Sequence, residues 1–255
     1  MRILLTNDDG ITSPGIVLLA KALREAGHRV FMVAPELDRS GTSHSITFLN
    51  LPCKIKQIED DTWSCTGTPA DCVIIALLGG IPELCLNDDR GKAPDLILAG
   101  VNCGANIGTD IVYSGTAAAA RQGSFFNIPS IALSLVEGKD GWHWGPAISF
   151  ITEKLAEMIS YWREGTFVNV NFPNTKTGAS VLIPAFPSLR CYNDVIETSP
   201  APYGGLYCFA RIGAATNKSG PVKSRGSDWE EVMKNNASVS VVFSQPVEAS
   251  RKDGA

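Results

Sequence analysis

The stretch RILLTNDDGITSPGIVLLAKALREAGHRVFMVAP (residues 2–35) decides the fold. Residues 2–7 and 28–35 are short apolar runs, which are typical of strands buried on both faces of a parallel sheet. Between these runs, apolar residues recur at helical spacing from Pro14, which suits a helix start, to Gly27, which suits a helix end. The stretch therefore predicts a strand–helix–strand unit of a parallel α/β sheet.

The same alternation of apolar runs and helical patterns continues as far as residue 173. We expect further β structure at 48–66, 94–102, 128–136 and 167–173, and helices at 69–78, 117–123 and 146–165. Beyond residue 174 the text becomes turn-rich, which indicates β-hairpins and a short helix at 228–234. The sequence thus predicts a doubly wound α/β core (1–173) and a β-hairpin-rich C-terminal arm (174–255).

Composition narrows the class of protein. The 255 residues are 44% hydrophobic, which is enough for a sizeable core, and the net charge of −4 disfavours a dedicated binder of duplex nucleic acid or of anionic membranes. The seven cysteines are odd in number and no pair is spaced C-x-x-C, which favours free thiols in a reducing compartment. The short apolar start predicts no signal peptide, and no apolar run reaches the ~20 residues of a membrane-spanning helix. We therefore expect a soluble, cytoplasmic protein.

Two adjacent acids, Asp8 and Asp9, follow the first predicted strand. Ligands of open α/β sheets bind at the carboxyl ends of the strands, so the pair either binds a divalent cation or supplies a helix cap and a solvated charge. Carboxylates are hard oxygen ligands that suit Mg²⁺, Mn²⁺ or Ca²⁺. Ser40 and Asn102 follow two other predicted strands and offer neutral oxygen ligands.

The segment NCGANIGTDIVYSGT (102–116) suggests a phosphate site beside the acid pair. Ser114, Gly115 and Thr116 precede an Ala-rich helix, whose start is either a simple cap or a site where free N–H groups bind phosphate. A carboxylate ~4 Å from a phosphate repels it with an energy of about 4 kcal/mol per charge pair at an effective dielectric of ~20. A divalent cation between them replaces this repulsion with attraction. The combination points to metal-dependent phosphoryl chemistry.

Two other functions remain open at this point. A phosphoacceptor receiver domain also has an acid pair after its first strand, but it needs a further Asp and a Lys after later strands, where this chain has Asn102 and Glu137. A non-catalytic nucleotide-binding module would use the same glycines and acids, and metal-dependent release of phosphate from AMP separates it from an enzyme.

Four ordered stretches carry a resemblance to a known family: LLTNDDGITSPG (4–15), VAPELDRSGTSHSIT (33–47), TGTPADCV (66–73) and VNCGANIGTDIVYSGTAAAARQG (101–123). With these motifs the chain resembles the survival-protein E (SurE) nucleotidases, which are metal-dependent nucleoside monophosphate phosphatases. The resemblance is dense over residues 1–135 and continues more thinly through NVNFP (169–173) and residues 227–242.

The resemblance implies a Rossmann-like α/β domain with a β-rich C-terminal arm that forms dimers or tetramers by arm exchange. It implies a 5'/3'-nucleotidase that acts on nucleoside monophosphates with one divalent metal ion per subunit, Mg²⁺ or Mn²⁺. The implied metal ligands are Asp8, Asp9, Ser40 and Asn102, of which Asp8, Asp9 and Asn102 are also the expected catalytic residues. The implied phosphate and substrate contacts are Ser40, Gly41, Asn106, Ser114, Gly115 and Thr116.

Overall fold

The computed structural model describes residues 1–87, 91–138, 140–192, 194–211, 215–217 and 225–246. Within these ranges the main sheet has nine strands in the order β3-β4-β2-β1-β5-β6-β7-β13-β8. Their bounds are β1 (Arg2–Thr6), β2 (Arg29–Pro35), β3 (Ile55–Glu59), β4 (Thr62–Cys65), β5 (Leu96–Cys103), β6 (Ser130–Leu135), β7 (Thr166–Phe172), β8 (Leu182–Pro184) and β13 (Ala237–Phe243).

The centre of this sheet is parallel. Neighbouring strands from β4 through β2, β1, β5 and β6 to β7 all run in the same direction, whereas β3 pairs antiparallel with β4 and β13 pairs antiparallel with β7. From β1 the chain first adds strands on one side, beginning with β2, and later adds strands on the other side, beginning with β5. The predicted doubly wound, mostly parallel α/β sheet is confirmed, and its switch point lies between β1 and β5.

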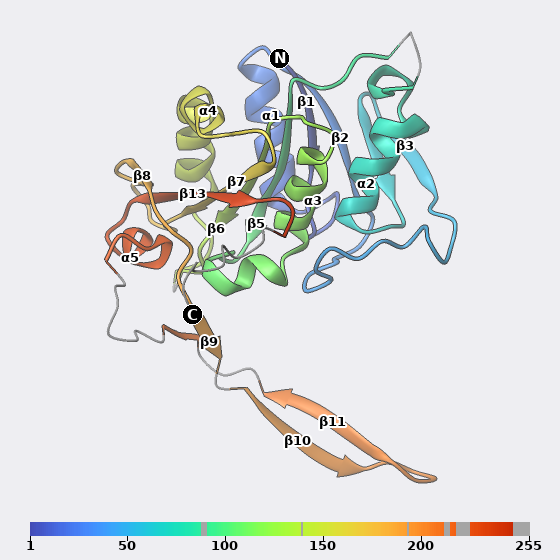
Figure 1. The fold of residues 1–255 in the computed structure, drawn as a ribbon, viewed down its shortest axis with the longest axis vertical. Coiled ribbons are helices and arrows are strands. Elements are labelled where there is room, and N and C mark those ends of the chain that lie inside the picture. The colour runs from blue at the N-terminus through green and yellow to red at the C-terminus, as the bar shows by residue number, and fades with distance from the viewer. Residues whose placement is uncertain (88–90, 139, 193, 212–214, 218–224, 247–255) are drawn as a thin grey trace, which may run out of the picture.

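Helices cover both faces of the sheet (Figure 1). Helices α1 (Pro14–Glu25) and α4 (Trp144–Ser160) pack with one apolar cluster, and α2 (Pro69–Ile75) and α3 (Gly115–Ser124) pack with the other. Shorter helical turns are η1 (Ala76–Gly80), η2 (Pro82–Leu84), η3 (Gly108–Val112) and α5 (Asp228–Met233). No helix in the described ranges combines the length and the apolar character needed to cross a membrane.

Three predicted helices differ from the observed ones at their ends. The helix expected at 146–165 is α4, which begins at Trp144 and ends at Ser160, because the chain turns at Tyr161 before it reaches Gly165. The helix expected at 69–78 keeps regular geometry only to Ile75 and continues as the wider turn η1, because Gly79 takes a φ of 146° that ends the helical path. The helix expected at 117–123 begins two residues earlier, at Gly115, because the Ser114 hydroxyl accepts a hydrogen bond from the Ala117 amide (2.9 Å) and caps it there.

The C-terminal third divides between the sheet and a projection. Strands β8 and β13 lie in the main sheet, and α5 packs against β13. Strands β10 (Val195–Pro200) and β11 (Leu206–Arg211) form an antiparallel hairpin that extends away from the body, and β9 (Arg190–Tyr192) pairs with β12 (Ala215–Asn217) near its base (Figure 1). The division of the chain into domains at residue 173 stays a prediction, although β8 and β13, which lie beyond it, complete the core sheet.

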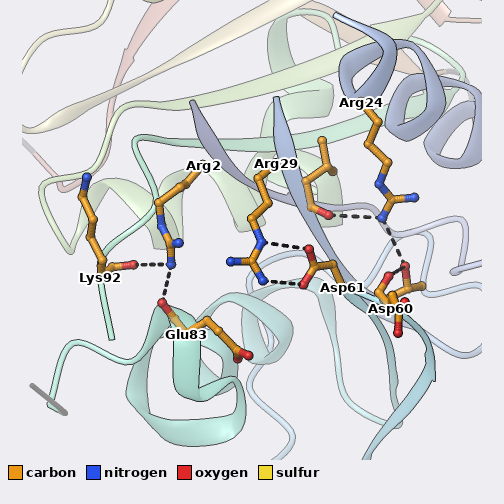
Figure 2. A network of polar contacts seen from close by, with 9 residues as sticks. Arg2, Arg24, Arg29, Asp60, Asp61, Glu83 and Lys92 are labelled. Atoms are coloured by element: carbon orange, nitrogen blue, oxygen red, sulfur yellow. Dashed lines mark hydrogen bonds and ion pairs between the residues drawn. The ribbon is translucent and has the colours of Figure 1, made fainter. Parts of the chain in front are cut away.

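Charged side chains join the amino ends of the central strands (Figure 2). Arg29, at the start of β2, makes a two-pronged ion pair with Asp61 in the β3–β4 turn, with both N···O distances at 2.9 Å. Arg2, at the start of β1, donates to the Lys92 carbonyl (3.2 Å) and to the Glu83 carbonyl. The guanidinium groups of Arg2 and Arg29 lie 5.0 and 4.4 Å from the centroid of the Phe31 ring. These contacts stabilise the amino ends of the strands, opposite to the carboxyl ends where the site is predicted.

Asp61→Asn should lower the free energy of unfolding by about 0.2–1 kcal/mol at pH 7, the range for ion pairs near the surface, since the Arg29 and Asp61 side chains are 48% and 28% exposed. Arg29 lowers the pKa of Asp61 below its ordinary value, so the stabilisation is present above about pH 3.8 and is lost as the pH falls further. Asn accepts the left-handed backbone at this position (φ 50°). Urea unfolding at pH 7 and pH 3 measures the effect. Asp60→Asn is the matched control, and an equal loss in both variants would contradict a specific Arg29 pair.

Candidate active site

The predicted acid pair lies at the switch point of the sheet. Asp8 and Asp9 follow β1, and Asn102 lies near the carboxyl end of β5, the strand that pairs with β1 in parallel. Asp8 and Asn102 are buried, with 3% and 9% of their surfaces exposed. The crevice outside the carboxyl ends of such strands is where open α/β sheets bind ligands.

A cavity of about 230 Å³ opens at this point. It brings together six of the predicted site residues from the carboxyl ends of β1, β2 and β5 and the loops that follow them: Asp8, Ser40, Gly41, Asn102, Asn106 and Ser114. Its remaining lining residues are Cys103, Ala105, Asp110, Tyr113 and Tyr192. Asp9, Gly115 and Thr116 are not among the lining residues, but each contacts one: Gly115 and Thr116 pack against Asp8, and the Asp9 carboxylate accepts from the Cys103 amide.

The start of α3 packs directly on Asp8. The Thr116 hydroxyl donates a hydrogen bond to Asp8 Oδ1, and a Cβ added to Gly115 would come within 2.9 Å of Asp8 Oδ2. The positive end of the helix dipole therefore faces a buried carboxylate, which it stabilises. Gly115 and Thr116, predicted as phosphate contacts, are engaged with Asp8 here, and their contact with phosphate stays a prediction.

Burial leaves the acid pair only partly stabilised. Burial raises the pKa of Asp8, although Thr116 opposes the shift, and burial together with the Asp8 charge raises the pKa of Asp9 to about 6. The one hydrogen bond found on the Asp9 side chain in the described residues comes from the Cys103 amide, 3.1 Å from Oδ2. A divalent cation beside both carboxylates would favour their ionised forms.

The neutral oxygens near the pair suit such a cation. The side-chain nitrogen of Asn102, Nδ2, donates to the Gly104 carbonyl (3.0 Å). This bond restrains the side chain and leaves Oδ1 as an acceptor. The Ser40 hydroxyl donates to Asp38 Oδ1 (2.6 Å), so its lone pairs can still face a cation. No cluster of three or more His, Cys, Asp or Glu suited to a metal occurs in the described part of the chain, so a cation here depends on these neutral ligands.

Backbone hydrogen bonds hold the three loops together. The Arg39 amide donates to the Asp8 carbonyl (2.7 Å), which links the loop after β2 to the acid pair. Ser43 links the same loop to the segment before α3, because its amide donates to the Tyr113 carbonyl (3.0 Å) and its hydroxyl donates to the Val112 carbonyl (2.7 Å). The cavity wall is thus braced independently of any bound group.

The buried side chains of Asn169 and Asn171 hold the backbone of Asn106 in place. Its backbone amide donates to Asn171 Oδ1 (2.9 Å), its carbonyl accepts from Asn169 Nδ2 (2.9 Å), and its side-chain nitrogen donates to the Ser134 hydroxyl (2.8 Å). The second hydrogen on the side-chain nitrogen of Asn106 stays available to a ligand. We did not predict Asn169 and Asn171 as site-supporting residues. The signal was two polar residues at i and i+2 in an apolar strand, which places both on one face.

Three further residues of the cavity wall were also missed. Asp110 and Tyr113 lie within the quoted segment 102–116, but nothing in its pattern distinguished them from ordinary loop residues. Tyr192 comes from β9, far along the chain, and its hydroxyl donates to Asp110 Oδ1. Only the packing of the C-terminal region against η3 reveals this contact.

Comparisons with known proteins agree with this geometry. The family model described as Survival protein SurE matches residues 3–184. The chain belongs to the SurE family. Proteins named 5'-nucleotidase SurE from Xanthomonas campestris pv. campestris (strain B100) and Xylella fastidiosa (strain M12) are 42% identical over 176 residues and 43% identical over 179 residues. Each match covers 68% of this chain and 64% of the relative, so the match spans less than two thirds of each relative's length.

The likeness extends to the whole SurE fold. The crystal structure of the SurE protein from Aquifex aeolicus superimposes with a TM-score of 0.79 at 31% sequence identity. The alignment covers 97% of this chain and 95% of the Aquifex chain. The structural alignment therefore extends well beyond residue 184, where the family match ends.

Gly115→Ala should lower the free energy of unfolding by about 1–3 kcal/mol, because the added methyl group would lie within 2.9 Å of Asp8 and force the helix start or the carboxylate to move. Gly145→Ala, near the start of α4, is the control, since a Cβ there meets nothing within 4 Å. Thermal or urea unfolding of both variants measures the difference. Equal stability of the two variants would refute the close packing of α3 on Asp8.

Proposed function

We propose that the protein is a metal-dependent phosphomonoester hydrolase that acts on nucleoside monophosphates, a 5'/3'-nucleotidase. The observation that carries the proposal is the cavity at the switch point of the sheet, where the buried carboxylate of Asp8, followed directly by Asp9, lies with the neutral oxygen ligands Ser40 and Asn102. Membership of the SurE family, whose relatives cited above are named 5'-nucleotidase SurE, supports the same activity.

In this proposal Asp8, Asp9, Ser40 and Asn102 hold one divalent cation per subunit, and Mg²⁺ or Mn²⁺ suits their oxygen atoms. When bound, the cation supplies Lewis-acid chemistry: it offsets the charge of the phosphate and activates water for attack on phosphorus. Burial and the neighbouring Asp9 charge raise the pKa of the Cys103 thiol to about 11, so without a bound metal this thiol is protonated and lacks the thiolate that softer metals prefer.

The chain's own groups position the substrate. The Asp8 side chain is restrained by Thr116 and the Asn102 side chain by the Gly104 carbonyl, so both are held in place before any ligand binds. Asn106 and Ser114 line the same cavity and offer polar groups to the phosphoryl oxygens. Gly41, which takes a φ of 72°, presents backbone without a side chain at the cavity edge.

A cytoplasmic location stays a prediction, in keeping with the free cysteine thiols.

Asp8→Asn should reduce metal-dependent phosphate release from AMP by about 100-fold or more, because even outer partners of metal ligands are worth ~10–100-fold. An Asn side chain can still accept the Thr116 hydrogen bond, so the variant should stay folded. Phosphate release is measured with Mg²⁺, with Mn²⁺ and after chelation, which should abolish the activity of the parent protein. Asp60→Asn is the control, and full activity of Asp8→Asn would refute the site.

We further propose that the protein assembles as a dimer or tetramer through the β10–β11 hairpin. Both strands of the hairpin are exposed along their whole length, and they carry several large apolar side chains. These side chains are 51–62% exposed: Val195, Ile196, Leu206, Tyr207 and Phe209. A two-stranded ribbon is only marginally stable alone, so a second copy of the chain that covers this surface would stabilise it.

Replacement of Tyr207 and Phe209 together by Ser should shift the particle mass toward the monomer, because the two rings contact each other and supply much of the exposed apolar surface. Light scattering coupled to gel filtration measures the mass. Val17→Ser on α1, at a comparably exposed apolar position, should leave the mass unchanged. A monomeric parent protein, or a double variant with the parent's mass, would contradict the proposed interface.

A further inference from the structure

The cavity changes character from its floor to its rim. Its polar floor is buried, since Asp8, Asn102 and Ser114 are 3%, 9% and 5% exposed. Its rim carries two tyrosines, Tyr113 and Tyr192, which are 60% and 37% exposed. An exposed aromatic pair at the mouth of a charged cavity is not needed to hold a metal or a phosphate.

The two tyrosines stand on fixed supports. The backbone at Tyr113 is tied to Ser43, as described above, and the Tyr192 hydroxyl donates to Asp110 Oδ1. The buried Asp228 carboxylate joins the two parts of the chain that carry them, because it accepts from the Gly108 amide (2.8 Å) and from the Ser188 amide (2.9 Å). The rim is therefore held in place from both sides, unlike an incidental pair of surface rings.

The size of the cavity indicates what the rim meets. Its volume of about 230 Å³ is below the ~300–1,000 Å³ of pockets that enclose a drug-sized ligand. If the phosphate binds near the buried residues Asp8 and Ser114, a cavity of this volume cannot also enclose the whole nucleoside, so the base must extend toward the exposed rim. Tyrosine rings bind the faces of bases by stacking, which contributes ~1–3 kcal/mol per base in single-strand binding proteins.

We propose that Tyr113 and Tyr192 form a stacking rim that binds the nucleobase of the substrate, and that Asp110 positions Tyr192 for this contact. The inference rests on the proposed nucleotidase function and names the part of the substrate that this surface recognises. Every base has a π face, so stacking at an open rim selects for the presence of a base and only weakly for its identity. The protein should therefore prefer nucleotides to phosphorylated sugars and accept all four common bases.

The test compares kcat/KM for AMP with kcat/KM for ribose 5-phosphate, which has the same phosphate and sugar but no base. Tyr113→Ala and Tyr192→Ala should lower kcat/KM for AMP by about 5- to 150-fold, mainly through KM, and should leave ribose 5-phosphate within about twofold. Tyr113→Phe should retain the parent's value, since the ring is kept. Phe48→Ala, an exposed aromatic residue outside the cavity lining, is the control and should change neither substrate.

Equal losses on both substrates would overturn the inference and show that the tyrosines only shape the cavity, and unchanged AMP kinetics in both Ala variants would also overturn it. Calorimetric titration of the protein with adenosine and with ribose supplies a readout that needs no turnover. If the parent protein releases no phosphate from AMP with either metal, the proposed function fails. Adenosine binding that both Ala variants lose would then still support the rim, and absence of adenosine binding by the parent would refute it.

Discussion

The contact between Asp8 and the start of α3 is the constraint on which the rest of the site depends. A glycine at position 115 lets the helix approach the carboxylate more closely than any side chain would permit, and Thr116 adds a hydroxyl donor at the same point. The helix dipole then favours a negative charge in a place where burial alone would neutralise it. The start of this helix, with the Thr116 hydroxyl, therefore favours the ionised form of Asp8 against the burial that raises its pKa.

The position of Asp8 in turn organises the neighbouring loops. Its own carbonyl accepts from Arg39, and the adjacent Asp9 carboxylate accepts from Cys103, so loops that follow three parallel strands meet at one dipeptide. Burial and the neighbouring Asp8 charge raise the pKa of Asp9 to about 6, and the hydrogen bond from the Cys103 amide opposes that shift only in part. The remaining electrostatic cost is what a divalent cation would remove, which explains why two acids can stand side by side at the end of a buried strand.

The sequence predicted the features that depend on local pattern and missed those that depend on distant contacts. The strand–helix–strand unit of residues 2–35 follows from apolar periodicity, and the parallel topology then brings the polar residues after β1, β2 and β5 to one edge. The addition of β13 and β8 to the main sheet beyond β7 could not be predicted from local sequence pattern, since a short apolar strand does not specify which strand it pairs with. Tyr192 was equally hidden, because its role depends on how β9 packs against η3.

The C-terminal region therefore contributes to two places at once. Its hairpin extends from the body, while Tyr192 at the base of the hairpin lines the cavity and Asp228 bonds the same region to the loop before α3. If a second copy of the chain covers the hairpin, assembly restrains the segment that carries Tyr192. Association and substrate recognition would then be linked through β9, whereas the floor at Asp8 and Asn102, which belongs to the sheet itself, would stay the same in any oligomeric state.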